Sequence, residues 1–140
     1  IGPRGATALA AALTKRAVPL LDLVSSDQNP IGDVGMASLA PALRQLPELE
    51  TLDLSNNEMT DEGLAALLAS PTEGVLPSLK VLYLRNNRIT DEGCATLASA
   101  LRGGALPALR ELWSLWLRLD GNPASEDAQD EAELVGLKTC

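Results

Sequence analysis

Two segments of this chain are close copies of each other. Residues 52–69 align without gaps on residues 82–99, with ten identities in eighteen positions. One glycine of each copy belongs to a longer series: Gly5, Gly35, Gly63 and Gly93. Successive members of this series are thirty, twenty-eight and thirty positions apart. A period in this range is typical of solenoids, in which no unit buries its apolar residues alone and stacking of the units closes the core.

Each repeated unit predicts a short strand followed by a helix. The strand pattern Leu-x-x-Leu-x-Leu-x-x-Asn occurs at 49–57 and at 79–87, and its alternation of apolar residues indicates a strand with one buried face. The helix begins at Thr-Asp-Glu-Gly, where a hydroxyl can cap free backbone N–H groups and two acids lie near the positive end of the helix dipole. Leu-Pro pairs at 46–47, 76–77 and 106–107 then return the chain to the next strand.

This pattern resembles the leucine-rich repeat family, and its period of twenty-eight to thirty positions with a full helix per unit is similar to the ribonuclease-inhibitor-type subclass. The resemblance covers roughly residues 1–125. It implies an α/β curved solenoid of about four repeats, with parallel strands on the concave face and helices on the convex face. We interpret residues 1–140 as a single domain, made of a helical half-repeat (1–17), three repeats (18–46, 47–76 and 77–106) and an irregular last repeat with an acidic C-terminal cap helix (107–140).

The first strand departs from the pattern and leaves two interpretations open. Counting back from Asn29 puts Leu21, Val24 and Ser26 at the inward positions, so that a hydroxyl replaces one core leucine. Alternatively, residues 21–23 form the strand and 24–27 hold a short insertion. We prefer the insertion.

The last strand also departs from the pattern. Leu109 and Leu112 keep the spacing of the two close copies, but the asparagine expected at position 117 is found at 122, so five residues are added between 111 and 120. Deleting residues 114–118 would restore a regular unit. We expect this insertion to form a bulge or an outward loop, because a continuous strand would switch faces near Ser114. Ser125 then caps a final helix that carries five acids between 126 and 133.

Several residues that could carry chemistry are better explained by the repeat. The aligned asparagines can satisfy unpaired loop groups, and we interpret them as structural: Asn29, Asn57, Asn87 and Asn122. Cys94 aligns with apolar residues in the other units, which predicts a buried thiol and not a nucleophile. The Asp-Glu pairs at 61–62 and 91–92 recur with the helix starts, so interaction with the helix dipole explains them without catalysis.

The outward strand positions of neighbouring units are expected to lie side by side in rows. One row is Thr51, Val81 and Glu111, the next is Asp53, Tyr83 and Trp113, and a third begins with Ser55 and Arg85. Aromatic residues beside arginine are typical of the dominant contacts at protein interfaces. We therefore predict a partner-binding site on the concave face, formed by Asp53, Ser55, Tyr83, Arg85, Arg88, Glu111, Trp113 and Trp116. Alternatively, the two tryptophans cover the open end of the core.

Composition excludes several classes of function. The chain has no histidine, which removes imidazole bases, His-dependent nucleophiles and His metal sites, and it has no Gly-rich phosphate loop and no Cys ligand cluster. We therefore predict no catalytic residue, no metal and no cofactor. The net charge of −8 disfavours nucleic acid and membrane surfaces and favours a protein or peptide partner with a basic surface. Two cysteines and the lack of a bilayer-length apolar stretch predict a soluble protein in a reducing, cytoplasmic setting.

These observations favour a non-enzymatic protein–protein interaction module that binds a protein or peptide on its concave strand face. Two alternatives stay open. The resemblance implies relatives that inhibit ribonucleases or accelerate GTP hydrolysis by small GTPases, so the chain could regulate a partner enzyme. The chain could also be a structural, terminal piece of a longer repeat array.

Overall fold

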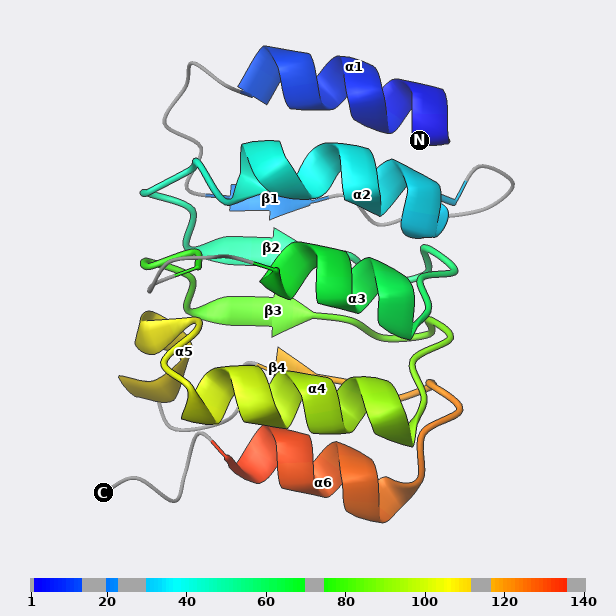
Figure 1. Cartoon of the computed structure of the whole chain (residues 1–140), viewed down its shortest axis with the longest axis vertical. Helices are drawn as coiled ribbons and strands as arrows, with labels where there is room; N and C mark the ends of the chain where they lie inside the picture. The colour runs from blue at the N-terminus through cyan, green and yellow to red at the C-terminus, as the bar shows by residue number, and fades with distance from the viewer. Residues whose placement is uncertain (1, 14–19, 23–29, 70–74, 112–116, 136–140) are drawn as a thin grey trace.

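Helices and strands alternate along the chain, except that α5 follows α4, and they form two layers (Figure 1). The computed structural model describes residues 2–13, 20–22, 30–69, 75–111 and 117–135. The helices are α1 (Pro3–Leu13), α2 (Gly32–Leu43), α3 (Asp61–Leu68), α4 (Asp91–Arg102), α5 (Pro107–Glu111) and α6 (Glu126–Leu134), and the strands are β1 (Leu20–Asp22), β2 (Thr51–Asp53), β3 (Val81–Tyr83) and β4 (Leu117–Arg118). The four strands make one parallel sheet in chain order, which confirms the predicted α/β repeat architecture.

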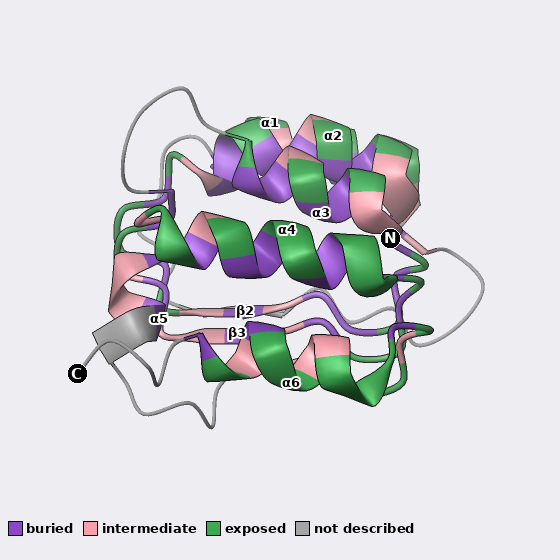
Figure 2. Cartoon of the chain, turned by 60° about the horizontal axis from the view of Figure 1, so that its bottom comes forward, coloured by how far each residue is buried: buried purple, intermediate pink, exposed green. Residues whose placement is uncertain are grey.

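The core lies between the sheet and the helices and is aliphatic. The inward leucines of the second and third units are 0% exposed: Leu49, Leu52, Leu54, Leu79, Leu82 and Leu84. Figure 2 shows the same division on the helices, where buried residues face the sheet and exposed residues face outward. Full burial of one such leucine stabilises the fold by about 1.5–3 kcal/mol, so the repeated leucines supply the main driving force for stacking.

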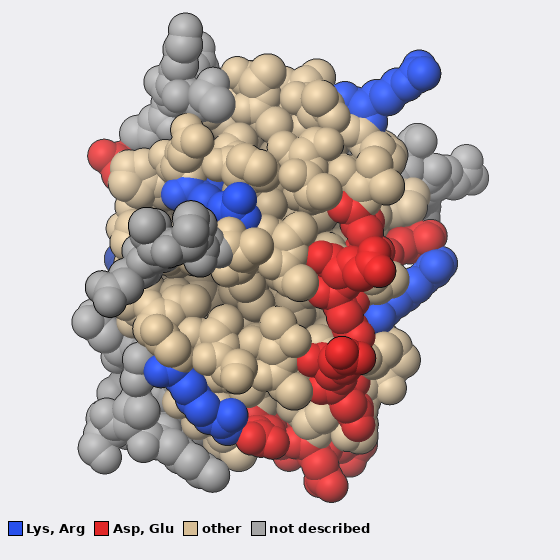
Figure 3. Space-filling view, viewed as in Figure 1, with Lys and Arg blue, Asp and Glu red and all other residues tan. Residues whose placement is uncertain are grey.

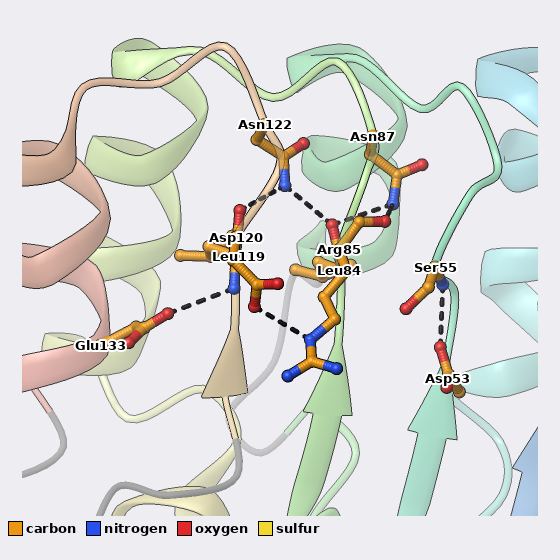
Figure 4. Close-up of polar contacts among 9 residues, drawn as sticks. All are labelled: Asp53, Ser55, Leu84, Arg85, Asn87, Leu119, Asp120, Asn122 and Glu133. Atoms are coloured by element: carbon orange, nitrogen blue, oxygen red, sulfur yellow. Dashed lines mark hydrogen bonds and ion pairs between the residues drawn. The ribbon is translucent and has the colours of Figure 1, made fainter.

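The asparagines join each unit to the next, as predicted. The side-chain oxygen of Asn87 accepts the backbone N–H groups of Asn57 and Met59, both at 3.0 Å, and its amide donates to the carbonyl of Leu54 at 3.0 Å. Asn122 repeats this arrangement one unit later (Figure 4). The buried amide satisfies backbone groups that would otherwise be unpaired, so its role is structural. This role explains why asparagine recurs at the same position of the repeat.

The helix starts are joined by a second set of contacts between units. The carboxylate of Asp33 accepts the backbone N–H of Thr60 at 2.8 Å, its hydroxyl at 2.7 Å, and the N–H of Gly63 at 3.0 Å. Asp61 binds Thr90, and Asp91 binds Ser125, in the same way through backbone N–H and hydroxyl. The Asp-Glu pairs were predicted only to complement the helix dipole, whereas Asp61 and Asp91 also bind the N-cap residue of the following helix.

These aspartates explain two members of the glycine series, Gly63 and Gly93, whereas a Cβ atom on Gly35 would instead lie 2.8 Å from the side chain of Ile31. A Cβ atom on Gly63 would lie 2.5 Å from a carboxylate oxygen of Asp33, and a Cβ atom on Gly93 would collide with the carboxylate of Asp61. Glycine therefore leaves the space that the aspartate of the preceding unit occupies. At the corresponding position of the last unit Ala128 is found, and there Asp91 binds Ser125 through its backbone N–H and hydroxyl.

The structure decides between the two interpretations of the first strand. Strand β1 pairs Leu21 with Leu52 and Asp22 with Asp53, which is the register of the interpretation with an insertion. The insertion itself, at 24–27, and Asn29 lie outside the described residues.

The prediction for the last strand was wrong. Residues 107–111 form α5, and β4 pairs Leu117 with Leu82 and Arg118 with Tyr83. The strand therefore begins later in the chain than the leucine spacing predicted, and residues 112–116 lie outside the described residues. The physical reason is Asn122, whose amide donates to the carbonyls of Leu119 at 2.7 Å and Leu84 at 2.8 Å and so sets the register from the C-terminal side of the strand.

Candidate protein-binding face

The face of the sheet opposite the helices carries the candidate site, and we call it the strand face. Along β2 and β3 the central leucine is buried while the residues on either side of it are partly exposed. Parallel strands in register point equivalent side chains to the same side of a sheet. The central row of the strand face is therefore Asp53, Tyr83 and Arg118, on three neighbouring strands.

Tyr83 lies at the centre of this row and is partly exposed. The guanidinium carbon of Arg85 lies 5.8 Å from the centroid of the Tyr83 ring, within the range of a cation–π contact. Arg85 is held in place because its Nε donates to the carboxylate of Asp120 at 2.9 Å (Figure 4). A tyrosine side chain has few rotatable bonds, so its ring presents apolar surface with little loss of side-chain entropy on binding.

Arg118 occupies the place next to Tyr83 that was predicted for Trp113. It is partly exposed, and within the described ranges no carboxylate forms an ion pair with it. Its charge acts on Glu133, where it partly offsets the rise in pKa that burial causes. Sequence analysis missed Arg118 because the leucine count put the strand too early, whereas counting back from Asn122 places Arg118 in the row of Tyr83.

Two further ion pairs flank the central row. Lys80 pairs with Glu50 at 2.8 Å, and Arg88 pairs with Glu58 at 2.7 Å, each across two successive units. All four side chains are exposed to solvent by about half, so each pair stabilises the fold by less than about 1 kcal/mol. Their main effect is that the charges of Lys80 and Arg88 are already neutralised by Glu50 and Glu58.

The remaining predicted site residues have varied positions. Asp53 is partly exposed and accepts the backbone N–H of Ser55 at 2.9 Å. Ser55 is only 6% exposed, so its placement on the accessible face was wrong: its small side chain lies below that surface. Glu111 is also misplaced, since it ends α5 and does not continue the row of Thr51 and Val81. Trp113 and Trp116 lie outside the described residues.

Helix α6 borders the last strand beside the candidate site. The carboxylate of Glu133 accepts the backbone N–H of Leu119 at 3.2 Å (Figure 4). Burial raises the pKa of Glu133 above its usual value, and Asp130 and Asp120 act in the same direction, while the Leu119 N–H and Arg118 lower it. The side chain thus satisfies a backbone donor of the final strand at some electrostatic cost.

Charge is distributed unevenly over the molecule. Figure 3 shows acidic side chains gathered along one edge of the helix layer. The first turns of four helices carry these acids: Asp33, Asp61, Glu62, Asp91, Glu92, Glu126 and Asp127. Charges near the strands are more evenly balanced, since Lys80, Arg85 and Arg88 each pair with a carboxylate.

Among the helices that the structure describes, none has the length and apolar character needed to cross a membrane.

The fold and its repeated contacts define an α/β domain of the leucine-rich-repeat type. Residues 47–92 match the family described as Leucine Rich repeats, in two copies. Among solved structures, the chain is similar to one described as "Leiomodin-1 Actin-Binding Site 2 (ABS2)", with a TM-score of 0.66 and 15% identity over 94% of this chain and 70% of that chain. It is also similar to the C-terminal domain of tropomodulin from Caenorhabditis elegans, with a TM-score of 0.51 and 18% identity over 99% of this chain and 93% of that chain. No curated protein matches the sequence significantly. At these identities the likeness shows the fold alone.

Proposed function

We propose that this chain is a non-enzymatic protein-interaction module that binds a protein or peptide partner on its strand face, around Tyr83. The observation that carries the proposal is the central row, in which a partly exposed tyrosine lies between Asp53 and Arg118 and under the guanidinium of Arg85. Tyrosine and arginine dominate the energetics of many protein interfaces because they combine apolar area with directional hydrogen bonds.

The domain architecture belongs to the same proposal. We propose that residues 1–140 act as one unit, that the repeats are of the ribonuclease-inhibitor type, and that the protein works in the cytoplasm. Helices α2 and α4, with 12 residues each, support the subclass, and the buried free thiol of Cys94 is compatible with a reducing compartment. The acids along the helix starts favour a partner whose outer parts are basic.

Actin is the first partner to test, because the similar leiomodin structure is described as an actin-binding site. The immobilised chain is incubated with purified monomeric actin, and the free chain is sedimented with actin filaments. Binding that the Tyr83→Ala substitution abolishes would support both actin and the strand face. Binding that the substitution leaves unchanged would place the actin site elsewhere.

If actin does not bind, the partner is captured from an extract of the source cells, identified and purified. Val34→Ala is the matched control, because Val34 is an apolar side chain on α2, in the helix layer, and is 71% exposed. A partner retained by the native chain and by Val34→Ala, and lost with Tyr83→Ala, is the result that the proposal predicts.

A further inference from the structure

We propose that Arg118 anchors the partner by binding a carboxylate from an acidic segment that packs against Tyr83. This inference rests on the proposed function, since it names the chemistry of the partner at the same face. It assigns a role to a residue that the sequence pattern does not single out.

Arg118 differs from the other cations near the sheet. Lys80, Arg85 and Arg88 each have a carboxylate within 2.7–2.9 Å, supplied by the unit before or after. No described carboxylate pairs with Arg118, although its position on β4 is fixed by backbone pairing with β3. A partly exposed guanidinium without an ion-pair partner can bind a carboxylate through two parallel N–H···O bonds.

Arg118 lies beside Tyr83 in the sheet. The two residues are register partners on neighbouring strands, which lie about 4.8 Å apart. At the tyrosine ring itself, Arg85 already donates to Asp120, so a ligand carboxylate there would compete with an existing ion pair, which is not the case at Arg118. A partner segment that places its acid on Arg118 therefore brings its neighbouring apolar side chain over Tyr83.

The charges around Arg118 favour a carboxylate over a phosphate. A phosphate group carries a charge of about −1.5 to −2, and one arginine would leave part of it unbalanced. Asp53 lies two strands away in the same row, and Asp120 belongs to the strand-face ion pair beside Tyr83, so excess negative charge would be repelled. A carboxylate matches the Arg118 guanidinium in both charge and planar geometry, and we commit to an acidic peptide segment.

The row also gives the bound segment a direction. Asp53 and Arg118 are separated by two strand spacings, about 10 Å, with Tyr83 between them. A bound segment with an acid next to Arg118 and a base next to Asp53 would satisfy both charges, and it could do so in one orientation only. The opposite orientation would place like charges together.

The test uses displayed peptides as probes. A library of short peptides is selected on the immobilised full-length chain, and binders to the Tyr83→Ala chain are removed. The selected peptides are synthesised, and their affinities are measured by calorimetry for the native chain, Arg118→Gln and Arg102→Gln. Arg102 is the matched control, because it is an exposed arginine on α4 that pairs with Glu131 at 2.6 Å.

We expect the selected peptides to contain Asp or Glu. Replacing that acid by its amide should weaken binding about tenfold or more, and Arg118→Gln should weaken it by a similar factor, because one charged hydrogen-bonded pair is lost in either case. Arg118→Gln combined with the amide form of the peptide should weaken binding little more than either change alone. Arg102→Gln should leave the affinity unchanged.

Charge exchange provides an independent arm. A peptide with Lys in place of the acid should bind Arg118→Glu better than it binds the native chain. Thermal unfolding measurements check that each variant is folded. If Arg118→Gln does not fold, the inference is tested with the native chain and the amide form of the peptide, and with the Arg118→Lys variant.

Three results would overturn the inference. Peptides that require Tyr83 but bind Arg118→Gln as well as the native chain would overturn the role of Arg118 and leave the proposed function standing. A phosphoserine peptide that binds more tightly than its Glu counterpart would overturn the assignment of a carboxylate. Failure to obtain any peptide that requires Tyr83 would contradict the proposed function as well.

Discussion

The carboxylate of Asp61 accepts both the backbone N–H of Thr90, at 2.8 Å, and the hydroxyl of Thr90, although the two residues are 29 positions apart in the chain. The first turn of one helix thus caps the next. Because the same contact joins Asp33 to Thr60 and Asp91 to Ser125, we interpret it as a continuous link along the helix starts.

Removal of this link should destabilise the domain. Asp61→Ala leaves the N–H and hydroxyl of Thr90 without their acceptors, and we expect the free energy of unfolding in urea to fall by about 1–2 kcal/mol. Glu62→Ala is the control, since Glu62 is an exposed neighbour with the same charge in the same helical turn. Equal losses in the two variants would show that only the dipole interaction matters.

The glycine at position 93 should depend on the same aspartate. Gly93→Ala puts a methyl group against the Asp61 carboxylate and within 2.7 Å of the Ile89 side chain, so we expect a loss of about 1–3 kcal/mol. The loss should be smaller in the Asp61→Ala background, where the carboxylate is absent. Ala128→Gly, at the corresponding position of α6, should instead cost about 0.5–1 kcal/mol through helix propensity alone. Additive losses at Gly93 and Asp61 would contradict the steric explanation.

Glu133 should make stability depend on pH. Its pKa is raised in the folded state, mainly by burial, so folding favours the protonated form. The stability from protonation is present below the pKa of an unfolded glutamate, about 4.3, and is lost as the pH rises through the folded-state value. Glu133→Gln keeps an acceptor for the Leu119 N–H without the charge, so its melting temperature should exceed that of the native chain at neutral pH and approach it in acid. A lower melting temperature at neutral pH would contradict this assignment.

Cys94 should be chemically inert in the folded protein. The side chain is 1% exposed, and burial together with the nearby Asp91 and Asp61 raises the pKa of its thiol to about 11. In the Cys140→Ser background, a thiol reagent at pH 8 should label the folded chain slowly and the urea-unfolded chain rapidly, because thiolate is the reactive form. Rapid labelling of the folded chain would show that the thiol is accessible.

Much of the fold could be predicted from the sequence because its leucines and asparagines recur in phase. Strands β2 and β3 and helices α3 and α4 follow directly from the two close copies. In the last unit, however, Leu109 and Leu117 both fit the start of a strand, and apolar periodicity alone does not choose between them. The choice is made by Asn122, whose side chain hydrogen-bonds the strand that precedes it and the strand beside it.

The candidate site was predicted less completely than the fold. Tyr83 and Arg85 belong to a regular unit, and the structure brings them together as the strand pattern suggested. Ser55 is buried and Glu111 lies on a helix, because outward position in a strand does not determine exposure and because the register was wrong near the C-terminus. The aspartate link between units was missed although its signal is present, since an acid at each helix start is followed by Thr or Ser at the start of the next.

The affinity of the purified partner for the native chain, Tyr83→Ala and Val34→Ala tests the central claim most directly. Truncation of a dominant interface residue costs about 2 kcal/mol or more, so we predict that Tyr83→Ala binds at least about 30-fold more weakly and that Val34→Ala binds as the native chain does. An unchanged affinity for Tyr83→Ala, or a loss with Val34→Ala alone, would contradict binding on the strand face.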